Sequence, residues 1–386
     1  MTHLLILIYR NIFRHRLRTL LTILAVAVAI LSFGILRTVI DVWYLGVDAA
    51  SSNRLVTRNA ISLIFYLPVS YKDKIMAVDG VKAVSYGNWF GGVYIDEKNF
   101  FPNFAIEPAG YLGLYPEIVL NEKERQDFIK DRKSAIIGQK LAKRFGWEIG
   151  DTVTLKGTIF PGNWDFTIRG IYKGRDKNTD ETLFLFQWDY LNEMIKKTIP
   201  TYRDHTGFFV IGIKDPSRAG EISQNIDNLF KNSLAETLTE TEKAFNLGFV
   251  AMTEAIVIVI ELISYVVIFI IMAVSANTMA MTARERSSEY AVLKTLGFRA
   301  SHLSFLIFGE SFLITMLGCL LGITLTFPVA DIFSASLSEY FPVFNISKDT
   351  ILLDIVAGCL IAMIAGIFPA LKAINTNIAS GLRKLV

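Results

Sequence analysis

The chain has 386 residues, of which 52% are hydrophobic, and its mean hydropathy is +0.41. A chain this apolar is not an ordinary soluble protein, and it is too long for one small domain. The formal net charge is only +3, and the sequence contains no basic face of the kind that binds nucleic acid.

The chain begins with an apolar stretch that is followed by arginines. Leu4–Ile8 precedes basic residues between positions 10 and 16, and this order predicts an amphipathic helix over residues 1–16 at the membrane surface. Residues 17–40 are apolar except near their ends and predict the first membrane span. A cleaved signal peptide is the alternative, but the apolar run is longer than that of a signal peptide.

Residues 41–246 have the pattern of an α+β domain. Short strand-like segments alternate with amphipathic helical segments, and acidic and basic residues are nearly balanced in number. Ser134–Gly146 begins as an apolar strand and continues as a helix that ends at its glycine. Gly92–Asp96 and Phe208–Ile213 are further predicted strands.

Three more apolar runs predict membrane spans at 247–280, 302–330 and 351–371. The first of them would be on the order of 45 Å long as a helix, so we expect it to project beyond the roughly 30 Å hydrocarbon core as a stalk. Gly318 and Gly322 have the spacing of a close helix-packing face. The predicted fold is a polytopic α-helical membrane protein with four transmembrane helices and a large α+β extracytoplasmic domain between the first two.

Basic residues predict the orientation. They are concentrated at the N-terminus, in the segment 281–301 and in the tail 372–386, whereas the short loop 331–350 is mainly acidic. Basic flanks remain in the cytoplasm. We therefore expect both termini and the segment 281–301 in the cytoplasm, and the domain 41–246 outside.

The segment 281–301 is charged, long enough for a helix, and enclosed by two apolar runs. Thr282 with Glu285 fits a capping box, and Gly297 stands where helices commonly end, so a short helix is predicted between them. The residues expected to line one face of that helix are Tyr290, Leu293 and Leu296. A solvated turn between two membrane helices is the alternative.

No motif of an enzyme is present. The sequence lacks a P-loop, and its four histidines have no metal-ligand spacing. We therefore expect no catalytic site, no metal and no nucleotide cofactor in this chain. Glu261 and Glu310 lie at membrane depth, where an ionisable group is costly and marks a candidate site. A satisfied hydrogen bond between helices is the alternative role for Glu310.

Taken in order, these features resemble the permease subunits of MacB-type (type VII) ABC transporters. That family includes macrolide and peptide exporters, lipoprotein-release permeases of the LolC kind and the cell-division permease FtsX. The resemblance covers essentially the whole chain. The stretches that carry it are Asn11–Thr22, Ile136–Ala142, Gly150–Val153, Arg284–Gly297, Glu310 with Gly318 and Gly322, and Pro369–Ala373.

The resemblance implies that the segment after the second span is a coupling helix that docks on a separate ATPase. The residues that would form this contact are Arg284, Glu285, Glu289, Leu293, Lys294 and Gly297. Ser287-Ser288-Glu289 departs from relatives, which commonly have a small or apolar residue and then a basic one. This departure affects the individual salt bridges rather than the docking.

The resemblance also implies the assembly and its location. Two copies of the permease, or one copy and a homologous permease, would work with two ATPase subunits that bind ATP and Mg²⁺, in the lipid of the bacterial inner membrane. A periplasmic adaptor and an outer-membrane channel are further candidate partners. The outer domain would have porter and sabre subdomains.

The function implied is mechanotransmission, in which ATP hydrolysis by the partner moves the outer domain to export a drug, a peptide or another periplasmic substrate. Lipoprotein release is the alternative within the family. An FtsX-like signalling or scaffold protein that regulates a periplasmic partner without transport is the alternative of another class, and an enzyme on a membrane anchor is a more distant one.

Overall fold

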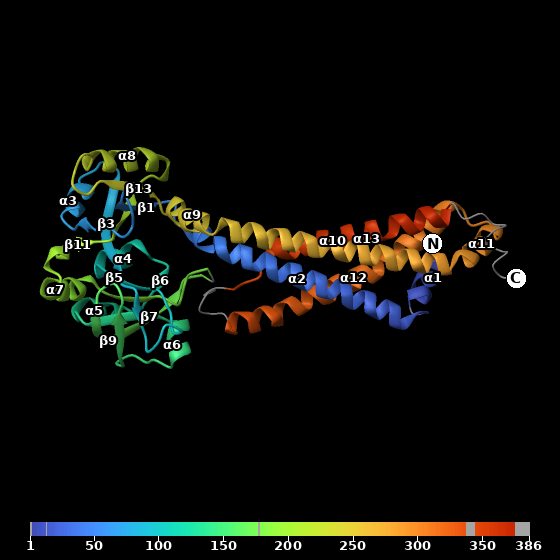
Figure 1. Cartoon of the computed structure of the whole chain (residues 1–386), viewed down its shortest axis with the longest axis horizontal. Coiled ribbons are helices and arrows are strands. Elements are labelled where there is room, and N and C mark those ends of the chain that lie inside the picture. Colours follow the sequence, from blue (N-terminus) through green and yellow to red (C-terminus); the bar gives the residue numbers. More distant parts are fainter. Residues whose placement is uncertain (1, 13, 177, 337–343, 375–386) are drawn as a thin grey trace. The chain divides into compact units, whose positions relative to one another are not determined.

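The computed structural model describes residues 2–12, 14–176, 178–336 and 344–374. The chain divides into two compact units (Figure 1). A helical unit is formed by the N-terminal part, up to Trp43, and by the described residues from Thr253 onward. An outer unit is formed by Tyr44–Met252. Most of the predicted tail 372–386 lies outside the described residues.

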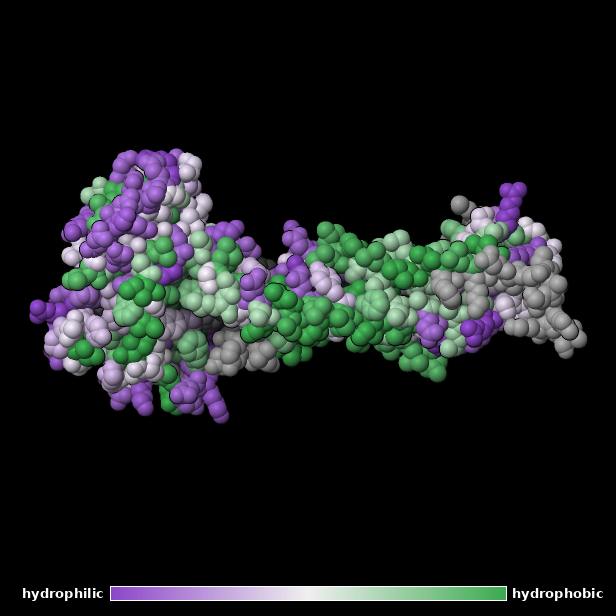
Figure 2. All heavy atoms as spheres, turned by 45° about the horizontal axis from the view of Figure 1, so that its top comes forward, coloured by the Kyte–Doolittle hydropathy of each residue, from purple (hydrophilic) through white to green (hydrophobic). Residues whose placement is uncertain are grey.

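The helical unit contains the four predicted spans. Its helices are α1 (Thr2–Ile12), α2 (Arg16–Ala49), α10 (Glu254–Glu285), α11 (Ser287–Thr295), α12 (Ala300–Ser336) and α13 (Lys348–Ile374). Of the described helices, α2, α10, α12 and α13 are long and apolar enough to cross a membrane. Figure 2 shows a continuous band of apolar side chains on this unit, as expected for a surface that faces lipid. Four transmembrane helices are thus confirmed.

The observed helices extend past the predicted spans. The helix α2 continues to Ala49 rather than ending at residue 40, and α12 continues to Ser336 rather than to residue 330. At 1.5 Å per residue, α2 is about 50 Å long, which exceeds a hydrocarbon core of about 30 Å. The length of the apolar run predicts only the part of a helix that lipid can cover. The helix itself can continue beyond that run through polar residues, so its ends were not predicted.

The predicted second span is two helices rather than one. The helix α9 (Glu242–Met252) ends before Thr253, whose backbone leaves the helical region with φ −114° and ψ 9°. The Thr253 hydroxyl accepts a hydrogen bond of 2.7 Å from the Trp43 indole N–H. Because α10 begins after this break, the prediction of one continuous stalk helix from Leu247 is wrong.

The four spans pack around small residues. Val26 and Ile30 of α2 lie in one buried cluster with Cys319 of α12 and Ile361 of α13. At Gly322 of α12, an added Cβ would lie 2.7 Å from the Ala27 carbonyl oxygen, and at Gly318 it would lie 2.9 Å from the Ile23 carbonyl oxygen. The structure therefore places both glycines against the backbone of α2.

The outer unit is built on one mixed sheet. Its strands follow the order β13-β1-β12-β3-β5-β10-β7-β9-β8-β4, and β6 pairs with β9. The strands of the outer unit are β1 (Arg54–Asn59), β2 (Leu67–Pro68), β3 (Val81–Trp89), β4 (Gly92–Val93), β5 (Asn103–Ile106), β6 (Ile118–Val119), β7 (Ser134–Gly138), β8 (Thr152–Gly157), β9 (Gly162–Gly174), β10 (Phe184–Gln187), β11 (His205–Thr206), β12 (Phe208–Ile213) and β13 (Thr237–Thr241). Of these, β2 and β11 pair with each other in a separate two-stranded sheet. Two pairs, β5 with β10 and β7 with β9, are parallel, and the other pairs are antiparallel.

Helices and a dense aromatic core cover this sheet. The helices are α3 (Tyr71–Met76), α4 (Pro108–Leu114), α5 (Glu122–Lys130), α6 (Gln139–Phe145), α7 (Trp188–Thr198), α8 (Ala219–Leu229) and α9, with 3₁₀ turns at Pro200–Tyr202 and Pro216–Arg218. Phe90 is fully buried and makes edge contacts with Phe166, Phe186 and Trp164. The predicted α+β domain is confirmed.

Local signals account for part of the outer unit. Ser134–Gly146 is strand β7 followed by helix α6, and Gly146 ends the helix in the left-handed conformation with φ 67°. This prediction is confirmed. The predicted strand Gly92–Asp96 is only β4, Gly92–Val93, because Ile95 has a positive φ of 62° that a strand does not allow.

We predict that Gly322→Ala lowers the thermal stability of the detergent-solubilised chain, because the new methyl group collides with the α2 backbone. Overpacking of this kind costs about 1–3 kcal/mol. The matched control is Gly248→Ala in α9, where an added Cβ has no neighbour within 4 Å. Equal melting temperatures for Gly322→Ala and the wild type would show that α2 and α12 do not approach this closely.

Candidate functional site

The short helix between α10 and α12 begins later in the sequence than predicted. The helix α10 continues through Thr282, whose hydroxyl donates to the Thr278 carbonyl at 3.0 Å, so this residue is no N-cap. The short helix α11 begins at Ser287, after Arg286 has left the helical conformation. The predicted capping box is therefore wrong. Gly297 has φ 91° and follows the end of α11, where a glycine was expected.

A buried ion pair lies behind α11. Arg286 Nη1 donates to Glu310 Oε2 of α12 at 2.7 Å, and each of the two side chains is only 9% exposed. The same guanidinium donates to Glu289 at 3.1 Å and lies 5.5 Å from the centre of the Tyr290 ring. A charge buried at this depth requires a partner. Glu310 is thus a partner of the α10–α11 junction.

The acidic residues of the segment bind arginines near the start of α2. Arg18 donates to both carboxylate oxygens of Glu285, at 2.7 and 2.9 Å, and Arg14 donates to Glu289. Burial alone would raise the pKa of Glu289, but Arg286 and Arg14 hold that pKa below its ordinary value. Glu289 is therefore charged at neutral pH, and its contribution to stability is lost as the pH falls through the lowered pKa.

Leu293 and Lys294 are directed toward the rest of the helical unit. Leu293 packs against two buried clusters, one that contains Ile12 of α1 and one that contains Leu303 of α12. The Lys294 ammonium donates to the carbonyl of Ile374 at 2.7 Å, at the end of α13. A cation is favourable at such a helix C-terminus. Both residues therefore hold α11 to its own chain.

A different set of residues faces outward. Leu296 is 70% exposed and Val292, four residues earlier, is 39% exposed. The prediction that Leu296 lines one face with Tyr290 and Leu293 is wrong. The helix α11 ends at Thr295, so Leu296 lies just past its last turn and is not on the inward face. The residues that we define as the exposed face of α11 are Val292, Thr295, Leu296, Gly297 and Arg299, all exposed. Arg284 is also exposed.

Glu261 lies far from this cluster. It is 24 residues before Glu285 in the same helix, which corresponds to about 36 Å. Its carboxylate lies 3.6 Å from the Arg37 guanidinium and accepts a hydrogen bond from the Tyr265 hydroxyl. The structure does not bring Glu261 and Glu310 together. Glu261 belongs to a second polar group, in which Asp41 also contacts Arg37, at 3.8 Å.

In the helical unit, the sequence did not reveal the buried charged residues Arg286 and Asp354. Arg286 was counted only as a basic flank, and nothing in its neighbours indicates that it bonds to a carboxylate 24 positions later. Asp354 of α13 is 1% exposed, and its Oδ1 atom has no hydrogen-bond partner among the described residues. Its position near the start of an apolar run could have identified it.

Two family models match this chain. The MacB-like periplasmic core domain matches residues 19–229, and the FtsX-like permease C-terminal domain matches residues 261–378. The first match alone spans more than half of the sequence. The chain belongs to the MacB/FtsX type of ABC transporter permeases. In such transporters the permease lies in the membrane and a separate subunit is the ATPase.

Relatives of the permease carry the same description. It is 24% identical to the uncharacterized ABC transporter permease MJ1507 of Methanocaldococcus jannaschii, over 97% of this chain and 96% of that protein. It is also 24% identical to the uncharacterized ABC transporter permease protein Rv0987 of Mycobacterium tuberculosis and to the ABC transporter permease YtrF of Bacillus subtilis, in each case over 68% of this chain. The match covers 31% of the Mycobacterium protein and 60% of the Bacillus protein.

Solved structures of extracytoplasmic domains match about half of the permease. The extracellular domain of the noncanonic ABC-type transporter YknZ from Gram-positive bacteria matches with 13% identity and a TM-score of 0.36, over 49% of this chain and 100% of that one. The periplasmic region of MacB from Actinobacillus actinomycetemcomitans matches with 11% identity and a TM-score of 0.38, over 53% and 95%.

We predict that Arg286→Leu destabilises the permease by about 3–5 kcal/mol, because it leaves the buried Glu310 carboxylate without its partner. Glu310→Leu should cost less, because Arg286 keeps its bond to Glu289. The double variant should be more stable than either single one, since neither charge remains. Thermal unfolding of the four proteins in one detergent measures the coupling. Strictly additive losses would contradict a direct bond between these side chains.

Proposed function

We propose that the permease couples ATP hydrolysis by a separate ATPase to movement of its outer unit, and that the exposed face of α11 is the docking contact. One observation supports this most directly. Glu289 and Lys294 of α11 are bonded to other parts of the permease, whereas Val292 and Leu296 are exposed. An apolar face with exposed arginines beside it is typical of a contact with another protein.

The bonds around α11 support transmission of movement. Glu289 links α11 to Arg14 before α2, and Arg286 links the start of α11 to Glu310 of α12. Glu285 links the end of α10 to Arg18 of α2. A displacement of α11 by the ATPase would therefore move α2, α10 and α12 together. The helix α2 is unbroken from this cluster to Ala49, which belongs to the outer unit.

This proposal revises which residues of the segment contact the ATPase. Glu285, Glu289, Leu293 and Lys294 are occupied within the permease, so they position α11. Contact is made by the exposed face of α11 together with Arg284. Ser287-Ser288-Glu289 is consistent with this division, because the basic partners of Glu289 come from the permease itself, at Arg14 and Arg286.

The assembly that we propose contains two permease chains and two ATPase subunits, and ATP and Mg²⁺ bind to the ATPase. Export of a drug, peptide or other periplasmic substrate is the proposed outcome. The orientation follows from charge: the termini and α11 lie in the cytoplasm of a bacterial inner membrane, and the outer unit lies outside.

We predict that Val292→Asp combined with Leu296→Asp reduces ATPase co-purification more than tenfold, because two carboxylates would be desolvated without partners in the contact. Both positions are exposed, so the stability of the permease should change by no more than about 0.5 kcal/mol. The matched control is Ile149→Asp in the outer unit, where an apolar side chain is 52% exposed. Unchanged co-purification would exclude the exposed face of α11 as the docking contact.

Orientation is tested with single cysteines in a chain in which Cys319 and Cys359 are replaced by alanine. In intact spheroplasts, a membrane-impermeant maleimide should label Ile149→Cys and leave His15→Cys unlabelled until the membrane is opened. Both positions are exposed to solvent, so access depends only on the side of the membrane. The reverse labelling pattern would contradict the proposed orientation.

A further inference from the structure

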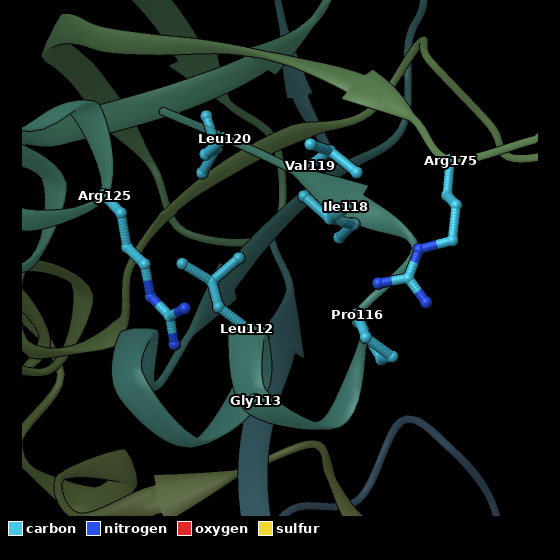
Figure 3. Close-up of a pocket in the computed structure, with 8 residues that line it drawn as sticks. All are labelled: Leu112, Gly113, Pro116, Ile118, Val119, Leu120, Arg125 and Arg175. Carbon is cyan, nitrogen blue, oxygen red and sulfur yellow. The ribbon is translucent and has the colours of Figure 1, made fainter. Parts of the chain in front are cut away.

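The outer unit contains a pocket of about 320 Å³ between α4, the loop that follows it, β6 and α5 (Figure 3). Most of its wall is apolar. The apolar residues that line it are Leu112, Pro116, Ile118, Val119 and Leu120. Gly113 of α4 completes this part of the wall and leaves it open. The size lies at the lower end of the range for small-ligand sites.

Two arginines stand at opposite sides of this pocket. Figure 3 shows Arg125, from α5, and Arg175, just after β9, with the apolar wall between them. Among the described residues, no carboxylate forms an ion pair with either guanidinium. Guanidinium groups bind phosphate and carboxylate through paired N–H donors. The pocket therefore combines an apolar surface with two cations that are available to an anion.

Three acidic side chains close in sequence to the lining residues are bonded elsewhere. Glu117 binds the Arg54 guanidinium at 2.7 Å. Glu124 accepts the Ile171 backbone N–H at 3.2 Å, and Asp176 accepts the Asn178 backbone N–H at 3.0 Å. The last two carboxylates thus support the backbone around the pocket. None of the three carboxylates therefore neutralises Arg125 or Arg175, and both guanidinium groups can attract an anionic ligand.

We propose that this pocket binds an amphiphilic anion, with its phosphate or carboxylate head at Arg125 and Arg175 and its alkyl body on the apolar wall. Both parts are needed: the head orients the ligand by charge-assisted hydrogen bonds, and burial of the alkyl body supplies affinity. The site does not depend on the docking of an ATPase. It gives the outer unit a binding role of its own.

The test uses the full chain in phosphatidylcholine nanodiscs, with empty nanodiscs subtracted, and isothermal titration. The probes are octyl phosphate, octanoate, inorganic phosphate and 1-octanol. We expect octyl phosphate or octanoate to bind, which identifies the head group, and the other two probes to bind at least about tenfold more weakly, since each lacks one half of the ligand. Equal binding of inorganic phosphate, or no binding of either amphiphile, would overturn the proposal.

Variants locate the site. Arg125→Gln combined with Arg175→Gln should weaken binding of the amphiphile about tenfold or more, whereas Arg132→Gln, which removes an exposed arginine of the same unit, should not. Gly113→Leu should also block binding, because an added Cβ there has no neighbour within 4 Å and the larger side chain can occupy the pocket without a clash. If the affinity stays at the wild-type value in both tests, the ligand binds elsewhere and the proposal fails.

Discussion

The arrangement at one end of the helical unit depends on a buried ion pair. Arg286 stands where α10 ends and α11 begins, and its guanidinium binds the buried carboxylate of Glu310 on α12 as well as the more exposed Glu289. Neither group can be buried without the other, since a lone buried charge costs several kcal/mol. The pair therefore fixes both the break between α10 and α11 and the position of α11 against α12.

Once α11 is fixed in this way, its two sides acquire different roles. The inward side binds arginines near the start of α2 and the last turn of α13 through Glu289 and Lys294. The outward side is left with Val292 and Leu296, which stay exposed among the described residues. A helix that transmits movement needs both properties: it must be firmly bonded to the membrane spans, and it must have an exposed surface for the partner that moves it. The structure of α11 supports the coupling proposal for this reason.

The sequence predicted the features that depend on composition and on near neighbours. Four apolar runs predicted the spans, and the strand, helix and glycine of Ser134–Gly146 follow from adjacent residues. The ion pairs could not be predicted, because Arg14 and Glu289 are 275 positions apart and no periodic pattern connects them. The capping box failed for a related reason: Thr282 bonds within α10, and the buried charge of Arg286 sets the start of α11. The pocket likewise joins Arg125 and Arg175 only through the fold.

The central claim is that the exposed face of α11 touches an ATPase. A photo-crosslinking amino acid at position 296, in cells that express the permease at its natural level, tests this contact directly. The account predicts an adduct with a protein that contains a P-loop, identified by mass spectrometry, and no such adduct from position 290, where the side chain of Tyr290 is only 2% exposed. Adducts from position 290 and none from position 296, or adducts with a periplasmic hydrolase, would contradict it.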